Sequence, residues 1–173
     1  FGHVFDYTRN TISAESSISV QSDRLPDECQ FLVDRMLARK WIPELPDQLT
    51  INRYRGPPHH QDHIPPHVDT HSMCTEWIVS VSIGSDIVMC FTNPRGSDQK
   101  TSAKSLVVLP ERSALVMKDE ARYLWRHAIA QTAIDVRPMR PNTGLKSTSK
   151  RLSLALRGER YSFTFRKVRP PGY

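Results

Sequence analysis

The sequence predicts a mainly β protein of the sandwich or jelly-roll class, with one or two flanking helices. Three observations support this prediction. From residue 48 onward, apolar residues recur at every second position in short segments, which is the period of strands. Glycine and proline clusters separate these segments, as turns do in antiparallel sheets. The 173 residues suit one domain, and no helices alternate with the strands as a parallel α/β sheet requires.

The N-terminal part contains the one convincing helix. Phe1–Tyr7 alternates weakly and is predicted to be a strand, and the polar, serine-rich Thr8–Arg24 is predicted to be a loop. Pro26–Lys40 begins with proline, carries acids in its first turn and ends on basic residues, which are helix start and stop signals. Its apolar positions lie three to four residues apart and form one buried stripe. The stripe consists of Cys29, Leu32 and Met36.

Eight segments after the helix are predicted to be strands, because they are short, alternating and rich in β-branched or aromatic residues. These segments are Gln48–Tyr54, Glu76–Ile83, Asp86–Thr92, Ser105–Leu109, Ser113–Lys118, Arg126–Ala130, Arg151–Leu156 and Arg160–Val168. Turn signals such as Gly84-Ser85 and Pro110 separate them. Two connections are long and are predicted to be loops, Thr92–Lys104 and Val136–Lys150.

Residues 1–173 are predicted to be a single domain cut from a longer protein with flanking domains, because the chain begins at Phe1 and not at methionine. No apolar run approaches the roughly 20 residues of a membrane span, and no signal-peptide pattern opens the chain, so no membrane partner is expected. The three cysteines, Cys29, Cys74 and Cys90, lie far apart. Their spacing favours a reducing compartment, the cytoplasm or the nucleus.

The charge of the chain suits a polyanionic partner such as a nucleic acid. The formal net charge is +6. The segment Val136–Arg151 contains no acidic residue. Its basic residues are Arg137, Arg140, Lys146, Lys150 and Arg151. This segment is either a solvated surface loop or a rim that contacts phosphates.

The motif His67-Val68-Asp69 is the first candidate for chemistry. On an extended segment, residues i and i+2 point to the same face, so an imidazole and a carboxylate can bind one ion. Two histidines and one carboxylate on one face of iron leave three positions open, as in non-haem Fe(II) oxygenases. H-x-D alone is a weak signal, and the third ligand has to come from a distant strand.

His127 is the candidate for that third ligand. It is the only histidine after position 71, and its neighbours in the sequence are aromatic and apolar. By itself it would be interpreted as a core histidine bonded to a backbone carbonyl. Together with H-x-D, about sixty residues earlier, it is better interpreted as a metal ligand.

A helical zinc site is the competing metal hypothesis. His63, His67 and His71 are spaced by four residues, which on a helix would place three ligands on one face. Pro65 and Pro66 argue against it, because proline removes a donor and keeps the preceding residue out of the helical region.

The segment Arg160–Arg166 is the candidate for binding an anionic co-substrate. Arg160, Ser162, Thr164 and Arg166 share one face of a strand, and the aromatic residues between them face the core. The two arginines could hold the two ends of a short dicarboxylate. The alternative is an edge strand whose polar face is simply solvated. Asn52 and Tyr54 share one face of another strand and can also bind carboxylate oxygens.

Together these residues resemble the AlkB family of Fe(II)/2-oxoglutarate dioxygenases: N-x-Y, H-x-D, a distant histidine and R-x-x-x-T-x-R. The resemblance runs from about Phe1 to Arg169. The blocks HVDTHS, IVSVSIGSDIVMCF, RYLWRHAI and RGERYSFTFRKVR are similar to the branch that hydroxylates a modified wobble uridine of tRNA. Ser162 departs from the commonest family pattern, which has asparagine there, but serine also occurs in this branch.

The resemblance implies a double-stranded β-helix core, with iron bound by His67, Asp69 and His127. It implies that 2-oxoglutarate is bound by the set Asn52, Tyr54, Arg160 and Arg166. The implied function is hydroxylation of a wobble-uridine side chain in tRNA. The alternatives are oxidative demethylation of alkylated DNA or RNA bases and a non-catalytic RNA-binding module. In the tRNA-modifying branch a structural zinc joins the histidine at His71 to later cysteines, but no cysteine follows Cys90 here.

Overall fold

The computed structural model describes residues 1, 5–6, 11–12, 24–56, 58, 62–71, 74–93, 103–138 and 152–169. Most of the predicted loops Thr8–Arg24 and Thr92–Lys104, and residues 139–151 of the basic segment, lie outside these ranges. Within the described part, no helix is long and apolar enough to cross a membrane.

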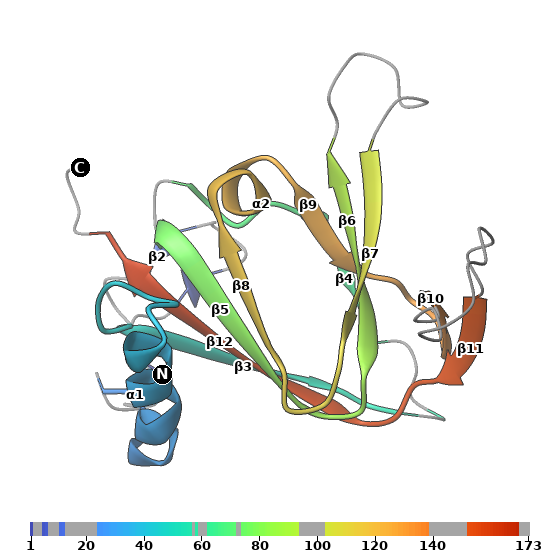
Figure 1. The fold of residues 1–173 in the computed structure, drawn as a ribbon, viewed down its shortest axis with the longest axis horizontal. Helices are drawn as coiled ribbons and strands as arrows, with labels where there is room; N and C mark the ends of the chain where they lie inside the picture. The colour runs from blue at the N-terminus through green and yellow to red at the C-terminus, as the bar shows by residue number, and fades with distance from the viewer. Residues whose placement is uncertain are drawn as a thin grey trace, which may run out of the picture.

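Two four-stranded antiparallel sheets face each other and form the predicted jelly roll (Figure 1). The first sheet has the order β3 (Gln48–Tyr54), β12 (Arg160–Val168), β5 (Cys74–Gly84), β8 (Ala114–Lys118). The second sheet has the order β4 (Ile64–His67), β9 (Arg126–Ile129), β6 (Ile87–Asn93), β7 (Ala103–Leu109). Strands that follow one another in the chain mostly alternate between the sheets, which is the double-stranded β-helix arrangement.

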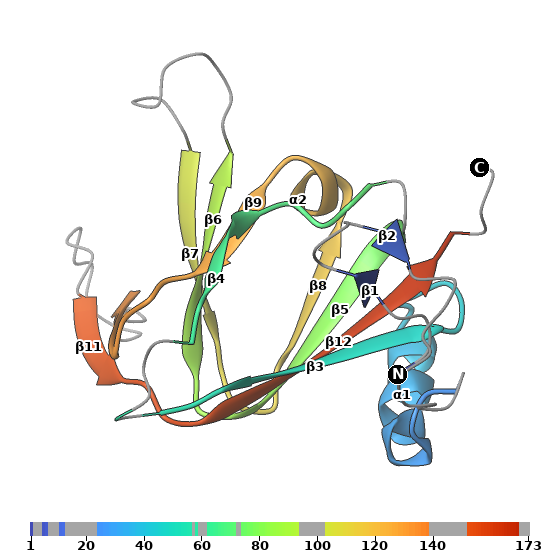
Figure 2. The same ribbon diagram turned by 180° about the vertical axis from the view of Figure 1, so that it is seen from behind.

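Smaller elements complete the described chain. These are the strand pairs β1 (Phe5–Asp6) with β2 (Thr11–Ile12) and β10 (Ile134–Pro138) with β11 (Leu152–Leu156), the 3₁₀ turn Asp27–Cys29, and the helices α1 (Gln30–Ala38) and α2 (Asp119–Tyr123). In both views α1 and the β10–β11 pair lie at opposite ends of the molecule (Figures 1 and 2).

Helix α1 packs on the outer face of the first sheet. Its residues Val33 and Met36 are buried in one cluster with Leu49 of β3 and Phe165 of β12. The helix predicted at Pro26–Lys40 is therefore confirmed with shorter bounds, and Val33 is more deeply buried than the expected Leu32. Helix α1 covers the aromatic side of β12, so the other side of that strand faces the second sheet.

The space between the two sheets is apolar in one part and polar in another. Ile78 and Met117 from the first sheet pack with Met89 and Ile129 from the second. The polar part belongs to β12, where alternate residues point between the sheets, as the sequence predicted for this strand. Tyr161 differs from the prediction, because its hydroxyl donates a hydrogen bond to Glu159 at the surface instead of entering the core.

The turn between β5 and β6 places the start of β12 beside the end of β5. Gly84 has a φ of +92°, and a side chain there would meet the backbone oxygen of Glu159 at 2.5 Å, so only glycine suits this position. The amide of Ser85 donates to the same oxygen at 2.7 Å. The predicted Gly84-Ser85 turn therefore also fixes the backbone just before Arg160.

Four elements were not predicted from the sequence: strand β2, which lies in the predicted loop Thr8–Arg24, strand β4, helix α2 and strand β10. Strand β4 contains Pro65 and Pro66, which an edge strand with a register irregularity tolerates. Helix α2 is one turn long and begins at Asp119, whose φ is +50°. Strand β10 occupies the beginning of the predicted Val136–Lys150 loop, which was wrong for Val136 to Pro138.

The β10–β11 pair is held to the jelly roll by buried ionic contacts. Asp135 accepts a hydrogen bond from the amide of Val88 at 3.0 Å and pairs with Arg157 at 2.6 Å. Arg137 pairs with Asp86 at 2.8 Å, so it does not stand free in a basic loop as the sequence had indicated. The opposite face of the pair is apolar and exposed. It consists of Ile134, Val136, Leu152, Leu154 and Leu156.

Candidate active site

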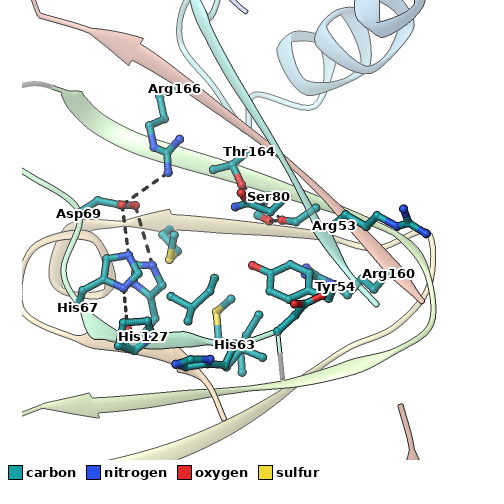
Figure 3. A pocket seen from close by; sticks show the side chains of 18 residues that line it. Arg53, Tyr54, His63, His67, Asp69, Ser80, His127, Arg160, Thr164 and Arg166 are labelled. Atoms are coloured by element: carbon teal, nitrogen blue, oxygen red, sulfur yellow. Dashed lines mark hydrogen bonds and ion pairs between the residues drawn. The ribbon is translucent and has the colours of Figure 1, made fainter. Parts of the chain in front are cut away.

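His67 and His127 are brought together by strand pairing. They are opposite one another in the antiparallel register of β4 and β9, although sixty residues separate them in the chain. Their ring centroids are 4.3 Å apart. His127 is 7% exposed, so it lies in the wall of the space between the sheets. The same two rings meet at one end of the pocket in Figure 3.

Asp69 lies just beyond the end of β4 and completes a three-residue cluster. One carboxylate oxygen is 3.6 Å from Nε2 of His67 and the other is 4.0 Å from Nε2 of His127. All three potential ligand atoms lie within 4.8 Å of one another. Adjacent ligands of an octahedral ion with bonds of about 2.1 Å lie about 3 Å apart, so small side-chain movements suffice to close on a metal.

The hydrogen bond made by the other nitrogen of His67 orients its ring. Nδ1 donates to the backbone oxygen of Pro65 at 2.9 Å, because a carbonyl oxygen can only accept. The lone pair of the neutral ring is then on Nε2, the atom that faces Asp69. Metal-ligating histidines in proteins are commonly oriented by such a bond. Pro65 therefore takes part in the site through its carbonyl group.

The surroundings of the three side chains shift their pKa values and so set their protonation states. Burial by itself would raise the pKa of Asp69, but hydrogen bonding to His67 and the positive charge of Arg166 outweigh it, and this pKa lies well below its ordinary range. Burial lowers the pKa of His127 to about 4. Contact with Asp69 raises the pKa of His67. At neutral pH the site thus contains a carboxylate and a neutral His127, the forms that bind metal ions.

A cavity of about 480 Å³ extends from this cluster along β12 (Figure 3). Hydroxyl groups line its floor: Ser80 and Ser162 are hydrogen-bonded at 2.8 Å, and Thr164 lies 3.4 Å from Ser162. Apolar side chains also line the cavity, among them Met117 of the first sheet and Met89 of the second. Sequence reasoning did not single out Ser80 or the methionines, because they lie in strands whose pattern predicts only burial.

Arg160 lies at the end of the cavity away from the histidines (Figure 3). It is 1% exposed, and its Nη2 donates to Ser82 at 2.8 Å. The guanidinium lies over the ring of Tyr54, 5.1 Å from the centroid. Within the described chain, Nη1 of Arg160 has no hydrogen-bond partner and no carboxylate pairs with the guanidinium. A buried cation with an unused donor is suited to bind an anion.

Arg166 lies at the metal end of the same strand face. Its Nη2 is 3.5 Å from Asp69, and its Nη1 donates to Thr50 at 3.2 Å. The structure thus separates the two arginines as the sequence predicted: Arg160 stands at one end of the cavity and Arg166 beside the candidate metal ligands (Figure 3).

Residues of β3 and of the segment before β4 also line the cavity. Asn52, opposite Ser162 in the strand register, lines it together with Tyr54. Nearby, Arg55 forms an ion pair with Asp62 at 2.8 Å, which ties the start of the β3–β4 connection to its end. All seven residues predicted for metal and co-substrate binding therefore line one cavity.

His71 stands apart from this cluster. Its ring contacts Tyr123 edge-on at 5.2 Å, and it is exposed. In the described ranges, the residues found close enough to share a metal ion are His67, Asp69 and His127, and His71 is not among them. The structure offers no support for the structural zinc.

Comparison with known proteins defines the family. The model of the 2OG-Fe(II) oxygenase superfamily matches residues 3–166. The chain belongs to this superfamily. As a 2OG-Fe(II) oxygenase it is a dioxygenase, and the family implies Fe(II) and 2-oxoglutarate as its metal and co-substrate.

Several relatives agree with the predicted AlkB resemblance. The oxygenase is 41% identical over 172 residues to the Mus musculus protein tRNA (carboxymethyluridine(34)-5-O)-methyltransferase ALKBH8, with 98% of this chain and 24% of the relative covered. A Xenopus tropicalis protein of the same name is 39% identical over 172 residues, with 98% and 25% covered. An Arabidopsis thaliana protein, Alkylated DNA repair protein ALKBH8 homolog, is 33% identical over 135 residues, with 71% and 34% covered.

The oxygenase chain spans about a quarter of the length of the first two relatives. These relatives are therefore several times longer than this chain.

Proposed function

We propose that this chain is the oxygenase domain that hydroxylates the side chain of a modified uridine at the wobble position of tRNA. The observation that carries the proposal is the convergence of His67, Asp69 and His127 at one end of a cavity that has the buried Arg160 at its other end, with Nη1 of that arginine lacking a partner in the described chain. The wobble-uridine substrate is supported by the similarity to ALKBH8 proteins, whose name refers to carboxymethyluridine at position 34 of tRNA.

In this proposal His67, Asp69 and His127 bind Fe(II). Two imidazoles and one carboxylate on one face of an ion are the donor set of this enzyme class, and they leave positions open for other ligands. When bound, iron together with 2-oxoglutarate and O₂ supplies the oxidation that places a hydroxyl group on an unactivated carbon. The protein holds the donors in one geometry and surrounds them with apolar walls such as Met89 and Met117, which limit the access of water.

The same proposal assigns 2-oxoglutarate to the rest of the cavity. Arg160 would bind the distal carboxylate through Nη1, which otherwise lacks a partner in the described chain. Arg166 would serve the end near the metal, where its guanidinium already lies 3.5 Å from Asp69. Asn52 and Tyr54, which line the cavity on β3, would assist with an amide and a hydroxyl group.

Oxidative demethylation of alkylated bases is the second candidate. It needs the same site and differs only in which carbon is attacked, because a hydroxylated N-methyl group is lost as formaldehyde. The similarity to the Arabidopsis thaliana protein named for alkylated DNA repair favours it. A non-catalytic RNA-binding module is the third candidate, and the intact His67, Asp69 and His127 cluster argues against it.

Mass spectrometry of nucleosides separates these candidates. The protein, loaded with Fe(II), is incubated with 2-oxoglutarate and tRNA that carries the modified uridine, and the tRNA is then digested. We expect one added oxygen atom on the wobble nucleoside, with succinate formed in proportion. Formaldehyde and an unmodified base from methylated oligonucleotides would identify a demethylase instead.

Asp69→Ala is the control for this experiment, because a site with two histidines alone cannot order the co-substrate and O₂. It should abolish both the added oxygen and succinate formation. If wild-type protein forms no succinate with any nucleic acid, the binding-module candidate is favoured and the proposed function is wrong.

A further inference from the structure

The three candidate metal ligands are not held in the same way. His67 and His127 belong to paired strands, so the β4–β9 ladder fixes their separation. Asp69 lies two residues beyond the end of β4, in the connection to β5, where no ladder holds the backbone. Something else has to keep this carboxylate in place, because a site held loosely by even one ligand loses metal affinity.

Arg122 of α2 makes the contacts that hold this connection. Its Nη1 donates to the backbone oxygen of Asp69 at 2.8 Å, and its Nη2 donates to that of Thr70 at 2.9 Å. Its Nε lies 3.4 Å from the backbone oxygen of Thr75 at the start of β5. The guanidinium thus spans both ends of the segment that carries Asp69, which runs beside α2 in both views (Figures 1 and 2).

Arg122 is buried, and removing its positive charge from water costs desolvation free energy. The residue is 2% exposed, and its hydrogen bonds within the described chain go to backbone oxygens. Desolvation accordingly lowers its pKa. A buried cation is tolerated when its donors are satisfied, and here backbone oxygens do this, with the Tyr123 ring 5.0 Å from the guanidinium.

Arg122 also connects Asp69 to the third ligand. It precedes His127 by five residues, and the connection is tight: the amides of Leu124 and Trp125 both donate to the backbone oxygen of Glu120, at 2.8 and 3.1 Å. The helix turn that carries Arg122 is therefore joined to β9 by a short bonded segment. Any shift of α2 would move the Asp69 segment and the start of β9 together.

We propose that Arg122 is a positioning residue of the metal site, which holds the main chain at Asp69 in register with His127. The inference rests on the proposed metal site at His67, Asp69 and His127. Arg122 touches neither metal nor co-substrate in this proposal. Its effect should therefore appear in metal affinity, where loss of a supporting contact commonly costs ten- to a hundredfold.

The test measures Mn(II) binding to the metal-free protein by titration calorimetry, with thermal unfolding recorded in parallel. Arg122→Met keeps the length of the side chain and removes all its donors. We expect its Kd for Mn(II) to rise about ten- to a hundredfold at a temperature where the variant is folded. Arg122→Lys keeps the charge but can reach only one of the two carbonyls, so its Kd should lie between those of wild type and Arg122→Met.

Arg157→Met is the matched control. Arg157 is also a buried arginine that donates to a backbone oxygen, that of Ala130, but it braces the β10–β11 pair. Its loss should lower the unfolding temperature and leave the Kd for Mn(II) unchanged. Equal weakening in Arg157→Met and Arg122→Met would show that the effect is general destabilisation and would overturn the proposal.

The remaining outcomes are also decisive. Wild-type affinity in Arg122→Lys and Arg122→Met overturns the proposal, and if Arg122→Met does not fold, wild-type affinity in Arg122→Lys alone does so. Failure of wild-type protein to bind Mn(II), or unchanged binding in His127→Ala, would instead contradict the metal site itself. The positioning role and the proposed site are thus tested separately.

Discussion

At the scale of single residues, His127 shows how burial determines protonation. Its pKa is about 4 in the folded chain, against an ordinary value of 6.5. Between these values the unfolded chain binds a proton that the folded chain does not bind. Lowering the pH from 6.5 to 4 therefore destabilises the folded metal-free protein through His127, and above pH 6.5 this group causes no such loss.

We predict that the metal-free protein loses on the order of 3 kcal/mol of stability from this group across that pH window. The measurement is urea unfolding at several pH values for wild type and His127→Gln, which has no titrating ring. The variant should show the shallower pH dependence. Identical slopes in wild type and His127→Gln would contradict the burial argument.

Arg160 carries the second prediction at this scale. Arg160→Lys keeps a positive charge but loses the planar fork, so both the bond to Ser82 and the unused Nη1 disappear. We expect the KM for 2-oxoglutarate in succinate formation to rise well above tenfold. Arg55→Lys, at the exposed pair with Asp62, should leave this KM near the wild-type value. An unchanged KM in Arg160→Lys would mean that the distal carboxylate is bound elsewhere.

At the scale of elements, the β10–β11 pair is anchored by the buried carboxylate of Asp135. Asp135 satisfies both the Arg157 guanidinium and the Val88 amide, which β9 leaves unpaired because that strand ends at Ile129. Asp135→Ala would leave the buried Arg157 guanidinium without its carboxylate and the buried Val88 amide without its acceptor. We predict a loss of about 3–5 kcal/mol in the free energy of unfolding, measured by urea denaturation.

An exposed ion pair provides the comparison for Asp135→Ala. Glu159→Gln weakens the pair with Arg53, whose side chain is 56% exposed, and should change the unfolding midpoint far less. If Asp135→Ala is as stable as Glu159→Gln, the β10–β11 pair is held by contacts other than those of Asp135.

Strand β4 shows the limit of local patterns at the element scale. Pro65 and Pro66 correctly indicated that this segment is not a helix. They also gave no indication of a strand, because proline cannot donate to a ladder. Among the described strands, β4 pairs only with β9, so its other edge needs no donors. That position at the edge of a sheet is a property of the assembled fold, and the local sequence does not reveal it.

At the scale of the whole molecule, the net charge of +6 and the basic segment Val136–Arg151 bear on the partner. We predict that Lys146→Ala/Lys150→Ala flattens the salt dependence of tRNA binding by roughly one to two units of slope, because each lost phosphate contact releases one counterion fewer. The measurement is tRNA affinity across a salt series. Uncoupled formation of succinate should be unaffected, since that reaction takes place without tRNA.

Equal salt slopes in wild type and the double variant would show that this segment is not part of the RNA surface. Arg137 was the first residue of the predicted basic run, and its pairing with Asp86 already excludes it from the charges freely available to phosphates. The variant therefore targets lysines further along the segment.

Local regularities of the sequence were sufficient to predict much of the fold and of the candidate site. Alternation with period two predicted the strands of both sheets except β4, and the same period placed Arg160 and Arg166 on one face of β12. The spacing in His67-Val68-Asp69 was enough to predict two donors on one side. These features follow from backbone geometry between near neighbours, which every short segment of sequence contains.

Only the tertiary structure decided which distant residues meet. The pairing of β4 with β9 brings His127 to His67, and α2 brings Arg122 to the backbone of Asp69, across 53 residues. Arg122 had no signal of its own in the sequence, because its partners are carbonyl groups, which every residue has. Contacts of this kind depend on how the two sheets close on each other, and that closure is a property of the whole chain.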